Sequence, residues 1–281
     1  VRTPWGGETA AQFLVDFYEL DGPPHDLDPR HVLGRVIDRF TADGLTPVLA
    51  VELEFYLVDP RRARDGKVRP ARPAYSRDTP RNVEVYGLRE LHDFRPFFDA
   101  LYAATDVQGL PLESAISEFA PGQFELTLRH KPDALRACDD AIMYKRLVKA
   151  IAQQHGLEAT FMAKPFAEQA GSGMHIHVSV NDDTGSNIFA SEDPEGTPAL
   201  RHAIGGMKQV NQLEVMTVGG AIGVAFRDGR PVPPVSVEQI AVHEIERGAD
   251  QDACQLLEAI PRERIPGQLE IDCGRLQHVK V

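Results

Sequence analysis

The sequence predicts an α+β fold in which a curved, mainly antiparallel β-sheet is lined by acidic side chains and covered on its outer face by helices. Two observations predict it. Residues 49–58 alternate between apolar side chains and polar ones that include Glu52 and Glu54, which is typical of a strand with one buried face. A Pro-Gly dipeptide at 121–122 separates two strand-like runs within residues 113–130, which indicates a β-hairpin.

Helix caps, helix-ending glycines and the spacing of apolar residues predict the other helices and strands. Asp28 and Pro29 give a helix cap followed by proline at the first helical position, and Gly44 ends that helix. Gly109 and Gly156 end two later helices in the same way. The first half of the chain is expected to contain an irregular opening segment over 1–27, a helix over 28–44, a strand over 47–58 and a surface loop over 59–86. A helix over 88–108, the hairpin over 113–130 and a helix over 131–154 follow. We then expect a short strand over 157–163, a strand over 171–180, a polar loop over 181–196 and a helix over 197–209. Beyond these, a helix near 237–247 and strand-like text near 268–281 are expected.

Composition narrows the class of protein. The 281 residues carry 30 Lys and Arg against 42 Asp and Glu, a formal net charge of −12, which disfavours nucleic acid and anionic membranes as partners and suits metal cations or amines. Three widely spaced cysteines, Cys138, Cys254 and Cys273, favour a reducing compartment over a disulfide framework. No apolar run approaches the roughly 18 to 20 residues of a membrane helix, and no signal-type segment opens the chain. We therefore expect a cytoplasmic protein.

The acidic side chains of the sheet are the first candidate ligands. Glu52 and Glu54 share one face of their strand, with carboxylates about 7 Å apart; such a pair is either a solvated outer face or a site for a hard cation. The hairpin adds Glu118 before its turn and Glu125 after it, where cross-strand neighbours approach to about 5 Å.

The run from Gly171 to Val180 adds imidazoles. His175, His177 and Ser179 alternate with apolar residues, so they share one face. A lone strand histidine is usually structural, but four carboxylates and two histidines that all lie opposite apolar stripes favour a cleft for divalent ions. Oxygen-rich ligation with one imidazole suits Mg²⁺ or Mn²⁺, and several ions in one acidic cleft indicate phosphate chemistry on a nucleotide.

Four runs carry a family resemblance: Glu-Leu-Glu-Phe at 52–55, Glu-Phe-Ala-Pro-Gly-Gln-Phe-Glu at 118–125, Phe-Met-Ala-Lys-Pro at 161–165 and Gly-Ser-Gly-Met-His-Ile-His at 171–177. In this order the sequence resembles the catalytic domain of the glutamine synthetase family. It is most similar to the members that join glutamate to ammonia or larger amines, including γ-glutamylpolyamine synthetases. The resemblance covers residues 1–209, a catalytic core; residues 210–281 form a C-terminal continuation that matches the family poorly.

The resemblance implies two metal ions, each Mg²⁺ or Mn²⁺. One would be bound by Glu54, Glu118 and Glu125. The other, on the nucleotide side, would be bound by Glu52 and His175.

The resemblance also implies the substrate contacts. His177 and Ser179 match positions near the phosphates of ATP, and Gly171 begins the loop beside glutamate. The run at 243–250 resembles the family's Ile-Glu-x-Arg-x-x-Gly-Ala-Asp, which implies Glu246 as a further metal ligand.

The implied function is an ATP-dependent ligase. ATP would phosphorylate the γ-carboxylate of glutamate, and ammonia or a primary amine would displace phosphate from γ-glutamyl phosphate, in a homo-oligomeric ring. Ala170 stands where the family has an Asn before Gly-Ser-Gly, which favours a larger amine over ammonia. The family's small N-terminal β domain has no match here and residues 210–281 match poorly, so a non-catalytic structural or assembly subunit with a metal-lined core is the alternative.

Overall fold

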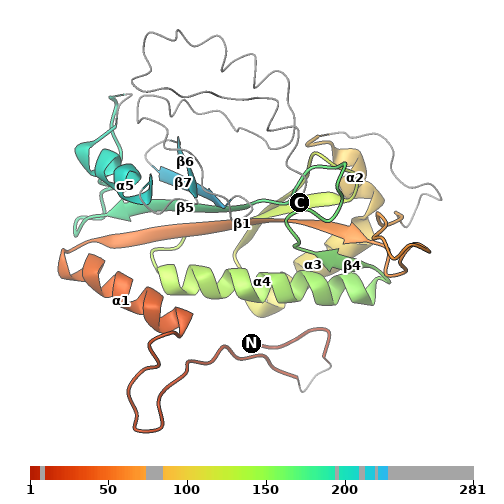
Figure 1. The fold of residues 1–281 in the computed structure, drawn as a ribbon, viewed down its shortest axis with the longest axis horizontal. Coiled ribbons are helices and arrows are strands. Elements are labelled where there is room, and N and C mark those ends of the chain that lie inside the picture. Colours follow the sequence, from red (N-terminus) through yellow and green to blue (C-terminus); the bar gives the residue numbers. More distant parts are fainter. Residues whose placement is uncertain (7–9, 74–84, 194–195, 209–212, 219–220, 227–281) are drawn as a thin grey trace.

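The computed structural model describes residues 1–6, 10–73, 85–193, 196–208, 213–218 and 221–226 (Figure 1). Its helices are α1 (Pro29–Ala42), α2 (Leu88–Asp93), α3 (Arg95–Gln108), α4 (Ala134–Gln154) and α5 (Pro198–Lys208). Its strands are β1 (Thr46–Val58), β2 (Leu112–Ser117), β3 (Gln123–Leu128), β4 (Glu158–Thr160), β5 (Met174–Asn181), β6 (Leu213–Val218) and β7 (Ala221–Phe226). The described strands form one sheet in the order β2-β3-β1-β5-β7-β6, with β4 beside β1, and each pair is antiparallel. The predicted α+β class is confirmed.

Strand β1 is the centre of the sheet because it pairs with β3, β4 and β5. Its odd-numbered residues Leu53, Phe55 and Leu57 are at most 4% exposed and belong to the main core, which includes side chains of α3 and α4. Figure 1 shows α1, α3 and α4 on the same side of β1. These three helices therefore cover one face, and the even-numbered carboxylates of β1 point to the other.

The predicted helix over 88–108 is two helices, α2 and α3, that meet at Phe94. Pro96 explains the break, because proline has no N–H and its ring clashes with the carbonyl four residues before it in a continuous helix. Phe94, Phe97 and Phe98 are nevertheless all buried.

The hairpin turn forms where it was predicted. Gln123 donates its backbone N–H to the carbonyl of Ala120 at 2.9 Å, and Gly122 adopts φ +78°, as the third residue of a type II turn requires. The expected opposition of Glu118 and Glu125 is wrong. Glu125 lies across from Ile116, whereas the backbone N–H of Glu118 donates to the Gln123 carbonyl at 2.9 Å. The two acids are thus diagonal neighbours, about 7 to 8 Å apart at their backbones rather than 5 Å.

The N-cap expected at Asp28 is formed, because its side chain accepts a hydrogen bond from the Arg30 backbone N–H, and Asp133 caps α4 in the same way by accepting from the Arg136 backbone N–H. The strand expected over 157–163 is shorter, at Glu158–Thr160. Strands β6 and β7 have no counterpart in the prediction and extend the sheet beyond β5. The elements expected near 237–247 and 268–281 lie outside the described residues, as does Glu246. Within the described part of the chain, the helices are too short or too polar to cross a membrane.

Candidate metal centre

Three adjacent strands bring the candidate ligands together on the face that α3 and α4 leave open. In the register, Glu52 of β1 lies opposite His175 of β5, and Glu54 of β1 lies opposite Glu125 of β3. Paired residues of an antiparallel sheet share a face. The sequence pattern of β1, the hairpin and β5 therefore creates one acidic surface with imidazoles at its β5 side.

The tightest group consists of Glu52, Glu125 and His175, whose ligand atoms all lie within 4.8 Å of one another. His175 Nδ1 is 3.6 Å from the nearer Glu52 carboxylate oxygen and 3.8 Å from that of Glu125. The three side chains are only 8 to 19% exposed. Two largely buried carboxylates repel each other unless a positive charge compensates them, so this donor set of two carboxylates and one imidazole fits a divalent cation.

His177 supports the same group from the next outward-facing position of β5. Its Nε2 lies 3.0 Å from Glu52, although the contact is not aligned as a hydrogen bond. Burial acts to raise the pKa of Glu52, but the interactions with His175 and His177 outweigh it and lower that pKa to about 2. Glu52 is therefore an ionised carboxylate at neutral pH, which is the form that binds metal. Ser179 follows on the same strand, opposite Val48 of β1.

The implied set of Glu54, Glu118 and Glu125 is arranged differently from the compact group. All three are 6 to 7% exposed, and they lie on one face of neighbouring strands. Glu125, however, is within ligand distance of Glu52 and His175, so it lies between the two implied metal positions. Glu54 Oε2 accepts a hydrogen bond from the side-chain amide of Gln123 at 2.9 Å.

The loop that contains Gly171 is held tightly against β1 and β3. Tyr56 donates its hydroxyl to the Ala170 carbonyl at 2.6 Å, and Glu54 donates its backbone N–H to Gly173 at 3.1 Å. A Cβ added at Gly171 would lie 2.8 Å from the Ala163 carbonyl oxygen, which is too close for a side chain. This close approach explains the glycine.

Burial raises the pKa of the Tyr56 phenol, and the negative charges of Glu54, Glu118 and Glu90 raise it further. The hydroxyl therefore keeps its proton and remains a donor to the loop. Glu90 itself is 7% exposed and accepts the Gly122 backbone N–H at 2.6 Å, which fixes the hairpin turn beside the acidic surface.

Sequence reasoning missed two members of this site, Gln123 and Glu90. Gln123 had a usable signal, because it lies two residues before Glu125 in the same strand and therefore on the same face. Glu90 had none, because it comes from a helix and its contact with the turn depends on tertiary packing.

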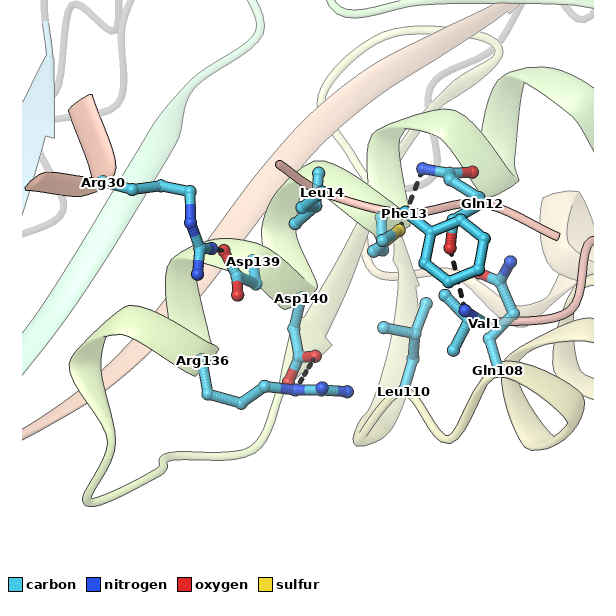
Figure 2. Close-up of a pocket in the computed structure, with 11 residues that line it drawn as sticks. Val1, Gln12, Phe13, Leu14, Arg30, Gln108, Leu110, Arg136, Asp139 and Asp140 are labelled. Carbon is cyan, nitrogen blue, oxygen red and sulfur yellow. Dashed lines mark hydrogen bonds and ion pairs between the residues drawn. The ribbon is translucent and has the colours of Figure 1, made fainter. Parts of the chain in front are cut away.

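A separate pocket of about 220 Å³ lies between the opening segment and helices α3 and α4, away from the acidic surface. Figure 2 shows Arg30 directed at Asp139 and Arg136 directed at Asp140 within it. In this pocket Arg30 is paired with Asp139, and Arg136 is paired with Asp140, whereas the acidic surface gathers charges of one sign.

Comparison with known proteins places this geometry in a family. A family model described as the catalytic domain of glutamine synthetase matches residues 26–218. The chain belongs to the glutamine synthetase family. The match includes β1, the hairpin and β5, which carry Glu52, Glu125 and His175, and it extends through β6.

Members of the glutamine synthetase family with related sequences include two amine ligases. Over 200 residues the chain is 40% identical to γ-glutamylputrescine synthetase PuuA of Escherichia coli strain K12, covering 71% of this chain and 42% of that protein. Over 204 residues it is 35% identical to the glutamate–isopropylamine ligase of a Pseudomonas species, covering 70% and 41%. A solved complex of GmaS with ADP superimposes with a TM-score of 0.59 at 29% identity, covering 67% of this chain and 42% of that one. The chain thus spans about two fifths of the length of these relatives.

Proposed function

We propose that this chain belongs to an ATP-dependent ligase that joins the γ-carboxylate of glutamate to a primary amine through γ-glutamyl phosphate. The observation that carries the proposal is the convergence of Glu52, Glu125 and His175 on one largely buried point. It is supported by sequence similarity to two ligases that are named for amines.

In this proposal Glu52, Glu125 and His175 hold Mg²⁺ or Mn²⁺ on the nucleotide side, and Glu54 with Glu118 completes a second position that shares Glu125. Divalent ions neutralise the charge of a transferred phosphoryl group. Glu52 supplies an ionised carboxylate for this purpose, since its pKa is held at about 2. Glu246 is proposed as a further ligand.

The remaining contacts follow from the same assignment. His177 and Ser179 on β5 lie next to His175 and would contact the phosphates of ATP. Gly171 would place its loop backbone beside glutamate, since the loop is fixed against β1 by Tyr56 and has no side chain in the way. Ala170, a small apolar residue at the rim of that loop, would favour a larger amine over ammonia.

The proposal includes the setting in which the ligase works: a cytoplasmic homo-oligomer with a catalytic core over residues 1–209 and a C-terminal continuation over 210–281. It requires glutamate, ATP and an amine as small-molecule partners. Neither nucleic acid nor a membrane is required, in keeping with the net charge of −12.

The test is ATP hydrolysis by the protein with Mg²⁺ and glutamate, compared with no amine, putrescine, isopropylamine and ammonium at equal concentration. We expect release of phosphate that depends on both glutamate and amine, with formation of the γ-glutamyl amide. Nucleotide binding without any amine-dependent turnover would instead support the non-catalytic subunit.

A further inference from the structure

Gln123 links two parts of the site with a single side-chain amide. Its Nε2 donates one hydrogen bond to Glu54 Oε2 at 2.9 Å and another to the Gly171 carbonyl at 2.8 Å. The residue is 1% exposed. Because both partners are acceptors, the nitrogen and not the oxygen must occupy this position, and both of its amide protons are used.

The rest of the structure keeps Gln123 from moving. It lies opposite Tyr56 of β1 in the register, and Tyr56 holds the carbonyl of Ala170, next to the carbonyl that Gln123 holds. On its other side, the preceding Gly122 is fixed by Glu90. The Gln123 amide is therefore held in place at the first residue of β3.

We propose that Gln123 is a positioning residue that locks the glutamate loop to the metal-binding carboxylates. The inference rests on the proposed function, which assigns Glu54 to a metal and Gly171 to glutamate. Since phosphoryl transfer depends on the alignment of the reacting groups, a loop that drifts relative to Glu54 separates the acceptor carboxylate from the bound metal. Gln123 acts through these two neighbours and does not itself touch the reacting atoms.

The chain contains a matched control for this residue. Gln108 of α3 is also buried, at 3% exposure, and its Nε2 donates to the backbone carbonyl of Arg2 at 3.0 Å. In both residues Oε1 has no hydrogen-bond partner among the described residues. Figure 2 shows Gln108 beside the opening segment, in the pocket that is separate from the acidic surface. The two glutamines thus differ mainly in their hydrogen-bond partners, which are Glu54 and Gly171 for Gln123 and Arg2 for Gln108.

The experiment compares Gln123→Met with Gln108→Met, since methionine keeps the length of the side chain and removes both donors. For Gln123→Met we expect the KM for glutamate to rise and kcat to fall, so that kcat/KM for glutamate drops by about 10- to 100-fold, as is usual when a group that orients a metal ligand is lost. The KM for ATP should change less than twofold. Gln108→Met should keep the wild-type values of both constants.

Two further measurements keep the proposal open to refutation. If Gln123→Met does not fold, Gln123→Leu replaces it, because leucine fits in the volume of glutamine, has no donor for Glu54 or Gly171 and adds no charge to the site. If the wild-type protein shows no amine- or glutamate-dependent turnover, the proposed function fails, and calorimetric titration with Mn²⁺ decides the role of Gln123 alone. Mn²⁺ affinity about 10-fold weaker than in Gln108→Met supports positioning.

Two results would overturn the positioning role of Gln123. In an active protein, a folded Gln123 variant with the wild-type KM for glutamate overturns it. In an inactive protein, an unchanged Mn²⁺ affinity overturns it.

Discussion

Replacing Glu52 with Gln in the metal-free protein should remove a stabilisation that depends on pH. Glu52 is ionised between His175 and His177, and these contacts lower its pKa from 4.5 to about 2 despite its burial. Because one pKa unit corresponds to about 1.4 kcal/mol, a pKa of about 2 in the folded chain stabilises it by about 3 kcal/mol. Glutamine has the shape of the protonated acid but no charge, so Glu52→Gln should lack this contribution.

The direction of the pH effect follows from the lowered pKa. The contribution is complete above the unfolded pKa of 4.5 and is lost as the pH falls toward about 2. Urea unfolding in EDTA, followed by circular dichroism, should therefore show wild type more stable than Glu52→Gln by about 3 kcal/mol at pH 5.5, above the unfolded pKa of 4.5. At pH 2.5 the difference should shrink to about 1 kcal/mol or less.

Glu158→Gln serves as the control. Glu158 pairs with Arg62 at 2.6 Å, but its side chain is 37% exposed, and an exposed pair contributes only about 0 to 1 kcal/mol. A difference between wild type and Glu52→Gln that is the same at both pH values, or no larger than that of Glu158→Gln at pH 5.5, would refute the electrostatic account of Glu52.

Three further predictions concern the site. His175→Ala should weaken Mn²⁺ binding by about 10-fold or more in a calorimetric titration, because it removes a ligand, and it should lower the unfolding midpoint by no more than Glu52→Gln does, because it removes one of the two contacts that lower the pKa of Glu52; normal Mn²⁺ affinity with a midpoint well below that of Glu52→Gln would make His175 structural. Gly171→Ala should lower kcat/KM for glutamate, because the added Cβ would lie 2.8 Å from the Ala163 carbonyl oxygen and displace the loop. A kcat/KM equal to that of wild type would show that the loop accommodates the Cβ without affecting glutamate. Ala170→Asn should shift the ratio of ammonium to putrescine turnover toward ammonium, and an unchanged ratio in initial-rate assays would remove Ala170 as a determinant of amine choice.

Much of the fold could be predicted because its signals are local. The alternation of β1, the Asp28 cap and the Pro-Gly turn each depend on a few neighbouring residues, and the structure has all three. The break at Phe94 was also local, yet the regular apolar spacing on both sides of Pro96 concealed it. Strands β6 and β7 were not assigned, and their place in the sheet depends on the pairing of β7 with the distant strand β5 and of β6 with β7.

The sequence indicates candidate site residues but not their geometry. Alternation alone correctly put Glu52 and Glu54 on the face away from the core. Which carboxylates converge depends on the registers of β3 and β5 against β1, and these bring Glu125 to Glu52 and His175. No spacing within the sequence gives the alignment of one strand with another, so the proximity of Glu125 to Glu52 and His175 comes from the structure, whereas the set of Glu54, Glu118 and Glu125 is what the family resemblance implies.

The central claim is that Glu52, Glu125 and His175 bind a divalent metal ion. The most direct measurement is anomalous X-ray diffraction from a crystal of the protein grown with Mn²⁺. The account predicts an anomalous peak within about 2.0 to 2.6 Å of a carboxylate oxygen of Glu52 and a ring nitrogen of His175, with Glu125 in the same cluster. Mn²⁺ bound only at other carboxylates, with these three side chains arranged as they are without metal, would contradict it.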